Sequence, residues 1–186
     1  MTTPATFAET AIELRVERIA HLFDAFDPFP IPSRDLAKTA EDFIVGWARE
    51  LPKDTRLKIV VYAPDEELKG DAARSVKEAL ARHFTYRAAS MSGDLKELFH
   101  RGRVSLGIGL SVLAACIVAG RAASGLAGAS DFGRFLVEGL FILGWVANWR
   151  PMEIFLYDWW PIEARRRLYR RLAEAPVEVL ALSARS

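Results

Sequence analysis

The sequence has a single cysteine and lacks the pattern of a cleavable signal peptide at its start. Cys116 cannot form a disulfide within the chain, and because it lies in an apolar run we expect it to be a small buried side chain. The first residues, MTTPATFAET, have neither a basic start nor an apolar segment, which excludes a signal peptide. We therefore expect residues 1–10 to be a flexible, cytosolic N-terminus.

Excess charge and catalytic motifs are also scarce. The formal net charge is only +1, which gives no general attraction to nucleic acid. The patterns of nucleotide, serine-hydrolase and zinc-protease sites (GxGxxG, GxxxxGK[ST], GxSxG and HExxH) do not occur. The histidines are too widely separated for metal-ligand spacing: His21, His83 and His100. The sequence thus predicts no cofactor, no metal and no nucleic-acid partner.

Apolar residues are plentiful, at 51% of a chain that is also 26% charged, so they must be concentrated in one part of it. Val104–Gly120 has no charge and would span about 26 Å as a helix, just short of a hydrocarbon core of about 30 Å. The helix can continue past Arg121, whose side chain can snorkel outward. Phe132–Trp149 is a second apolar segment, with only Arg134 and Glu138 inside it. Together they predict a transmembrane hairpin.

Basic residues are concentrated on the outer flanks of this predicted hairpin. Only Arg121 and Arg134 lie between these two flanks. The positive-inside rule then places both termini in the cytoplasm. The flanking residues are Arg87, Lys96, Arg101 and Arg103 before the first span, and Arg150, Arg165, Arg166, Arg167, Arg170 and Arg171 after the second. We expect the five arginines from Arg165 to Arg171 to bind anionic lipid headgroups, at about 1 kcal/mol each.

The segment from Trp149 to Pro161, WRPMEIFLYDWWP, combines aromatic and charged side chains. Trp and Tyr favour the boundary between lipid and water, so the sequence predicts an interfacial belt. Pro151 should end or kink the preceding helix, after which the chain would turn along the membrane surface. The expected membrane-interface residues are Trp149, Arg150, Tyr157, Trp159 and Trp160.

Arg150, Glu153 and Asp158 are expected to form a polar cluster in which the guanidinium binds carboxylate oxygens. The favoured role is structural, because such a cluster would fix the turn between the membrane helix and the cytoplasmic domain. The alternative is acid/base chemistry, since burial beside hydrocarbon can raise the pKa of a carboxyl group.

Three short segments have β-strand patterns. Ile12–Glu17 alternates apolar and charged residues, Leu57–Ala63 is apolar and β-branched, and Val177–Leu182 follows the hairpin. Ser33 is the expected N-cap of a helix between the first two strands. The apolar face of that helix would comprise Leu36, Ala40, Phe43, Ile44, Trp47, Ala48 and Leu51.

A second helix is predicted from Asp71, with Val76, Leu80 and Phe84 on one face, and Ser92-Gly93-Asp94 predicts a further helix start. Strand, helix and strand make a βαβ unit. The final strand either joins this sheet, which we favour, or forms an isolated tail.

The predicted fold is therefore an α+β membrane protein. A small cytoplasmic α/β domain, built from the βαβ unit and the C-terminal strand, carries an inserted two-helix transmembrane hairpin. The expected parts are residues 11–100 (α/β domain), 101–150 (hairpin), 151–173 (interfacial aromatic and basic segment) and 174–186 (C-terminal strand).

Two segments also carry a family resemblance. Gly144–Pro161 resembles a WRPxEIFLYDWWP-like segment shared by a family of uncharacterised bacterial two-span membrane proteins, and Leu22–Pro30 with Arg34–Leu36 is similar to that family's N-terminal segment. The resemblance covers most of the chain and implies the bacterial inner membrane as its location. It implies no reaction, ligand or catalytic residue.

Small residues recur every four positions in the first span: Gly107, Ser111, Ala115 and Ala119. Such a face permits close helix packing in lipid. The second span of the same hairpin is the favoured partner, and another chain is the alternative.

Glu138 is acidic within an apparent span, and Arg134 lies one turn before it. A local ion pair is the favoured interpretation, and a proton or ion pathway is the alternative.

These features favour a non-enzymatic accessory or scaffold subunit that anchors a cytoplasmic domain in the membrane. It would associate with itself or with another membrane protein. The alternative is a membrane enzyme or a conduit for ions or small solutes that uses carboxylates near the membrane interface.

Overall fold

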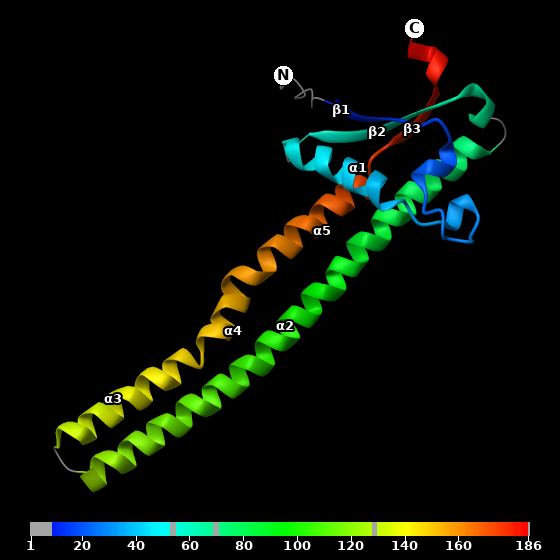
Figure 1. Ribbon diagram of the computed structural model, residues 1–186. Helices are drawn as coiled ribbons and strands as arrows, with labels where there is room; N and C mark the ends of the chain where they lie inside the picture. The colour runs from blue at the N-terminus through cyan, green and yellow to red at the C-terminus, as the bar shows by residue number, and fades with distance from the viewer. Residues whose placement is uncertain (1–8, 53–54, 69–70, 128–129, 186) are drawn as a thin grey trace, which may run out of the picture. The chain divides into compact units, whose positions relative to one another are not determined.

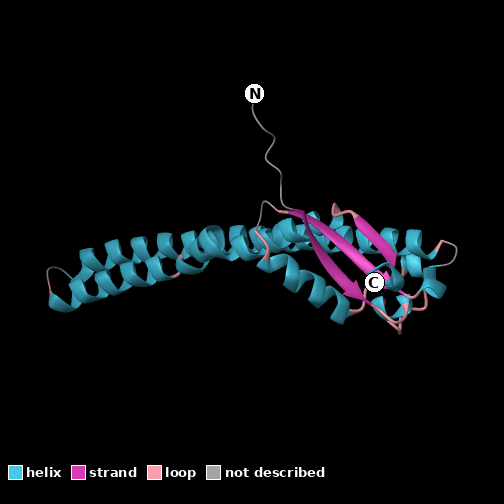
Figure 2. Cartoon of the chain, turned by 90° about the horizontal axis from the view of Figure 1, so that it is seen from above, coloured by secondary structure: helices cyan, strands magenta, loops and turns pink. Residues whose placement is uncertain are grey.

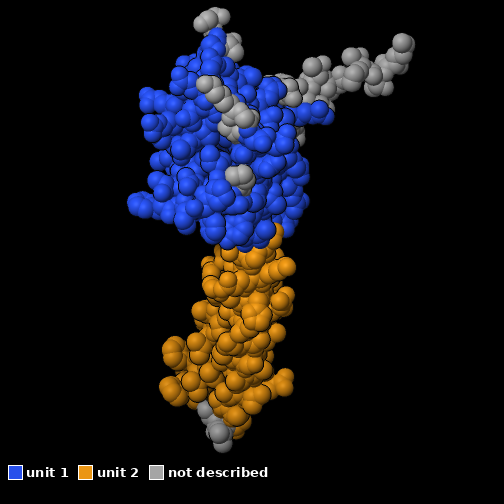
Figure 3. All heavy atoms as spheres, turned by 90° about the vertical axis from the view of Figure 1, so that its right-hand side faces the viewer, with its two compact units in different colours: residues 1–90, 164–186 blue, residues 91–163 orange. Residues whose placement is uncertain are grey.

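The computed structural model of the chain describes residues 9–52, 55–68, 71–127 and 130–185. They belong to two compact units, which Figure 3 colours separately: residues 1–90 with 164–186, and residues 91–163. We call the first the sheet unit and the second the hairpin unit. The chain leaves the sheet unit after Ser90 and returns to it at Ala164, so one unit is inserted in the other. The inserted segment is longer than the residues 101–150 expected from the sequence.

Three parallel strands form the sheet, in the order β1-β2-β3. The strands are β1 (Glu9–Arg15), β2 (Arg56–Ala63) and β3 (Val177–Ala181). Ile59 of the central strand lies between Ile12 and Val177 in the register. The C-terminal strand therefore joins the N-terminal sheet, as predicted, and the alternative of an isolated tail is wrong.

One face of the sheet forms the core of this unit. Ile12 and Leu14 alternate with exposed residues along β1 and are buried on that face, as are Ile59 and Val61 of the central strand, where Val60 is buried as well. The helices of the sheet unit lie on the same side, as Figures 1 and 2 show. The strands lie in sequence order across the sheet, and the connections from β1 to β2 and from β2 to β3 both cross on this face. The two connections therefore have the same handedness.

Helix α1 (Lys38–Glu50) begins later than the sequence predicts. Ser33 is not its N-cap: it lies in a short 3-10 turn, and Ala37 occupies the cap position without a side-chain cap. The reason is that Leu36 forms an antiparallel bridge with Phe23, which keeps the chain extended just before the helix.

The buried face of α1 also differs from the prediction. Phe43 and Trp47 are 44% and 48% exposed, whereas Glu41 is only 6% exposed and lies among the buried residues. Ile44 and Ala48 are buried, as expected.

Helix α2 (Ala72–Ala127) is continuous, so the predicted helix start at Ser92-Gly93-Asp94 is wrong. A glycine inside a helix costs about 1 kcal/mol relative to alanine, which a helix of 56 residues absorbs. Its first turns bury Val76, Leu80 and Phe84, as predicted.

Helix α3 (Asp131–Val146) has Ser130 as its N-cap, and the Ser130 side chain accepts a hydrogen bond from the Gly133 N–H. The chain then continues through α4 (Trp149–Glu153), a π-helical turn (Ile154–Asp158) and α5 (Trp159–Ala173). The break between α3 and α4 falls at Ala147 and Asn148. Pro151 lies in the first turn of α4, where a missing N–H costs no helical hydrogen bond.

One helix among the described residues is long and apolar enough to cross a membrane, within Ala73–Gly125. Helix α3 has 16 residues, fewer than the 17 or more that a span of about 30 Å needs. The structure thus supports the predicted membrane character in part, and it does not establish two spans.

Candidate functional site

The two long helices of the hairpin unit contact each other through glycines. A Cβ at Gly109 would lie 2.9 Å from the Ala147 carbonyl oxygen, and a Cβ at Gly144 would lie 3.2 Å from the Leu113 Cα. Asn148 joins the helices, because its Nδ2 donates hydrogen bonds to the carbonyl oxygens of Gly109 (3.1 Å) and Gly144 (2.9 Å). Only residues without a side chain permit this approach.

The contacts follow an antiparallel register. From the turn outward, Gly120 lies opposite Val137, Leu113 opposite Gly144 and Gly109 opposite Asn148. On α2, three of the positions in close contact, Gly102, Gly109 and Cys116, recur every seven residues, which is two helical turns. The predictions from the sequence did not include this seven-residue spacing.

The predicted small-residue face lies elsewhere on α2. Gly107, Ser111, Ala115 and Ala119 are all exposed, and a Cβ at Gly107 would meet nothing within 4 Å. The expectation that this face packs on α3 is therefore wrong. The face remains uncovered within the described part of the hairpin unit.

The aromatic segment does not turn away after Pro151, contrary to the prediction. Ile154 and Phe155 pack against α2, where a Cβ at Gly102 would lie 2.8 Å from the Ile154 Cγ2 and 3.1 Å from the Phe155 Cζ. The rings of Phe155 and Phe99 are also stacked, with 6.2 Å between their centroids. Helical structure with an apolar contact face carries the chain on beside α2, so nothing forces a turn at the proline.

Two of the three indole N–H groups of this segment have partners within it. Trp149 donates to Glu153 at 2.9 Å and Trp159 donates to the Phe155 carbonyl oxygen at 3.1 Å. Trp160 makes edge contacts with the rings of Tyr157 and Trp159. The rings of Trp149, Tyr157 and Trp160 remain more than half exposed, which leaves apolar surface available to lipid or protein.

The structure brings together the three charged residues of the polar cluster. Arg150 lies 3.0 Å from Glu153 and 3.1 Å from Asp158. The guanidinium thus joins the first turn of α4 to the end of the π-helical turn. Because each carboxylate faces this cation, the geometry fits the structural role better than acid/base chemistry.

Arg134 and Glu138 do not form the predicted ion pair. Arg134 instead contacts Asp131 at 2.6 Å, one turn nearer the start of α3. Asp131 lies in the first turn of the helix, where a negative charge is favourable, and it pairs with Arg134 from there. Glu138 is exposed and has no hydrogen bond or ion pair with any described residue.

The basic residues of α5 do not form one uniform surface. Arg171 donates hydrogen bonds to the carbonyl oxygens of Pro52 (3.2 Å) and Thr55 (2.8 Å). It therefore secures the segment before β2, contrary to the expected role as a headgroup ligand. Arg165 and Arg170 are exposed.

A buried polar network in the sheet unit went unnoticed in the sequence. Glu41 of α1 accepts hydrogen bonds at one carboxylate oxygen from Arg87 of α2 (2.8 Å) and from the Tyr169 hydroxyl of α5 (2.9 Å). Its other oxygen lies 3.4 Å from the His83 Nε2. The Leu36 N–H donates to the His83 Nδ1 at 3.4 Å. One carboxylate thus ties three helices together.

Burial alone would raise the pKa of Glu41, but the hydrogen bonds from Arg87 and Tyr169 and the charge of Arg87 outweigh it, so the pKa is lowered. For Tyr169, burial and the hydrogen bond to Glu41 both raise the pKa. The network is therefore built around an ionised carboxylate and a neutral phenol.

We expect the sheet unit to lose stability in acid partly through Glu41. Because its pKa is lower in the folded state, the stabilisation is complete above the ordinary value of 4.5 and is lost as the pH falls through the folded-state pKa. Urea unfolding of the full chain in mild detergent at pH 7, 5, 4 and 3 measures this. Glu41→Gln should flatten the decline below pH 5, and parallel losses in both proteins would contradict the prediction.

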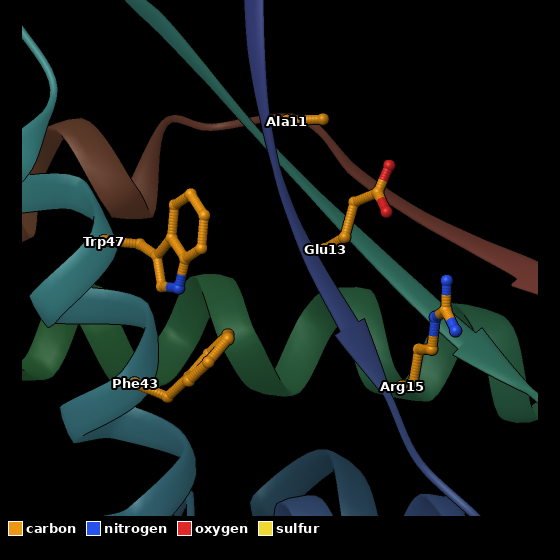
Figure 4. A pocket seen from close by; sticks show the side chains of 5 residues that line it. All are labelled: Ala11, Glu13, Arg15, Phe43 and Trp47. Atoms are coloured by element: carbon orange, nitrogen blue, oxygen red, sulfur yellow. The ribbon is translucent and has the colours of Figure 1, made fainter.

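A shallow pocket of about 430 Å³ lies at the free edge of the sheet. Figure 4 shows Phe43 and Trp47 projecting from α1 towards β1, where Ala11, Glu13 and Arg15 complete the lining. The two rings lie 6.2 Å apart. The pocket contains no residue of the predicted sites, and its lining lacks a cluster of groups suited to catalysis.

Comparison with protein-family models, curated proteins and solved structures gives no match to this chain. The family resemblance expected from the sequence therefore stays a prediction, and the function must be argued from the geometry above.

Proposed function

We propose that this chain is a non-enzymatic integral protein of the bacterial inner membrane, an accessory or scaffold subunit. Its hairpin unit would cross the bilayer as two spans and anchor the sheet unit on the cytoplasmic side. The observation that carries the proposal is the exposure of α2: only 17% of its most apolar stretch of 18 residues is buried. A core helix of a water-soluble protein would bury that surface.

Side chains of the second helix support the same proposal. Phe135, Phe141 and Ile142 are each at least 60% exposed on α3. A span from Asp131 to Arg150 would be about 30 Å long at about 1.5 Å per residue, which matches the hydrocarbon core. It would run through the break at Asn148, whose amide group donates to two backbone carbonyls there. Such pairing is what polar groups in lipid require.

Association with another membrane helix is part of the proposal. The small-residue face on α2 is uncovered, and Glu138 has no partner among the described residues. Each feature would be stabilised by a helix that packs against it, because lipid offers neither close packing to small residues nor a counter-charge.

Gentle detergent extraction followed by native mass measurement tests this function. We expect an oligomer of this chain, or a complex with another membrane protein. A stable monomer with no co-purifying protein would count against the scaffold role.

The orientation gives a separate prediction. Ser183→Cys, in a Cys116→Ala background, should react with a membrane-impermeant maleimide only from the cytoplasmic side, since Ser183 is exposed near the C-terminus. Ser130→Cys, at the turn between α2 and α3, is the matched control and should react only from the periplasmic side. Periplasmic labelling of Ser183→Cys would overturn the proposed topology.

A further inference from the structure

We propose that the hairpin unit pairs with a second copy of this chain, through two reciprocal ion pairs between Arg121 of one copy and Glu138 of the other. The inference rests on the proposed membrane insertion and names the partner. Arg121 and Glu138 are both exposed, and neither has a hydrogen bond or ion pair with any residue that the structure describes.

The two charges lie at the same depth in the hairpin. Arg121 precedes the end of α2 at Ala127 by six residues, and Glu138 follows the start of α3 at Asp131 by seven. At about 1.5 Å per residue, each is about 10 Å from the turn. The contact between Gly120 and Val137 also places the two charges at the same depth, because Arg121 directly follows Gly120 and Glu138 directly follows Val137.

The charges also point to the same face of the hairpin. A single step along a helix rotates the side chain by about 100°. Because α2 and α3 are antiparallel, one step forward from the contact on each helix turns both side chains towards the same side. The same step from Gly109 and from Gly144 leads to Leu110 and Trp145, which are each 52% exposed. The face therefore combines two unpaired charges with apolar surface.

A second copy suits this face because of symmetry. Two copies inserted in the same direction are related by a two-fold axis along the membrane normal. When their equivalent faces meet about that axis, α2 of each copy lies opposite α3 of its partner. Arg121 then faces the partner's Glu138 at equal depth, and the second pair forms by the same operation. Charge complementarity is thus satisfied twice by one interface.

Alternative ways of satisfying Glu138 within the chain are weaker. Arg134 on the same helix already contacts Asp131. Arg121 of the same chain lies at the same depth and on the same face, but the structure shows no ion pair between it and Glu138. The long side chain of Arg121 can snorkel towards the interface, but the short side chain of Glu138 cannot reach it in the same way. An ionisable group so placed is costly in lipid without a counter-charge.

Charge reversal in separate chains tests the pairing. Arg121→Glu and Glu138→Arg, each expressed alone, should reduce the dimer fraction in native mass measurements at least about tenfold, because like charges then face each other. Co-expressed with different affinity tags, the two variants should form heterodimers at the wild-type level, since one pair then keeps its original sign and the other is restored with reversed sign. An ion pair within one chain would not be restored by mixing.

Further measurements separate this inference from the proposed function. Each variant should remain in the membrane after carbonate washing, which reports insertion independently of pairing; loss of wild-type protein in that wash would defeat the membrane proposal itself. Ala115→Leu, on the small-residue face, should leave the dimer intact. Single reversals that dimerise like wild type, or co-expressed variants that stay apart, would overturn the reciprocal pairing.

Discussion

Replacing Glu41 with alanine should lower the free energy of unfolding of the sheet unit by about 3 kcal/mol, the lower end of the range for breaking a buried ion pair. The lower end applies because the Arg87 side chain is 37% exposed and can regain water. The Tyr169 hydroxyl, in contrast, is buried and would lose its acceptor. Since this carboxylate of α1 binds residues of α2 and α5, the loss of stability should affect the whole sheet.

Amide hydrogen exchange of the full chain in mild detergent measures the effect. Protection of β2, the central strand, should fall by about a hundredfold in Glu41→Ala, which corresponds to about 3 kcal/mol. Asp42→Ala is the matched control, because Asp42 is 65% exposed and, among the residues that the structure describes, pairs only with the exposed Lys38; it should change protection by less than about threefold. Equal effects of the two substitutions would show that the network contributes nothing.

The strands were predictable because short patterns within each segment indicate them. Alternation in Ile12–Glu17 and a β-branched run in Leu57–Ala63 report the burial of each strand directly. We also expected the C-terminal strand to join this sheet, but neither its partner β2 nor its parallel direction follows from a local pattern. The start of α1 was missed because a tertiary bridge between Phe23 and Leu36, which no local pattern reveals, determines it.

The spacing of residues in α1 indicates the Glu41 network, although the prediction did not use it. Glu41 precedes Ile44, Val45 and Ala48 by three, four and seven residues, so it belongs to the buried face of α1. A charged side chain is more often found at a solvated position. His83 similarly shares a face with Leu80, but was considered only as a possible metal ligand. A polar residue at an apolar helical position is itself an indication of a buried network.

The packing face of α2 was mispredicted because two spacings of small residues occur in one helix. A four-residue repeat runs through Gly107, whereas Gly102 and Gly109 belong to a seven-residue repeat. A straight helix has 3.6 residues per turn, so a repeat of four drifts around its surface and a repeat of seven stays nearly in line. Packing along α2 within the hairpin unit therefore follows the seven-residue repeat.

This distinction gives the prediction with the other large effect. Gly109→Leu should separate α2 from α3 at a cost of about 3 kcal/mol, at the upper end for overpacking. The Cβ alone would lie 2.9 Å from the Ala147 carbonyl oxygen, which belongs to the backbone and cannot rotate away. The two hydrogen bonds from Asn148 across the interface would be lost as well. Gly107→Leu is the matched control, because a Cβ there meets nothing within 4 Å.

Cys116, the sole cysteine of the chain, provides the measurement. Its side chain is 7% exposed, and a Cβ at Gly144 of α3 would lie 3.3 Å from its Cβ, so the thiol is covered only while the helices stay together. In mild detergent a small maleimide should label it at least about tenfold faster in Gly109→Leu than in wild type, with total labelling after denaturation as the reference. Gly107→Leu should label at the wild-type rate. If both leucine variants label alike, the seven-residue repeat does not determine how the hairpin unit packs, and the face that we assign to a second copy would have to be reassigned with it.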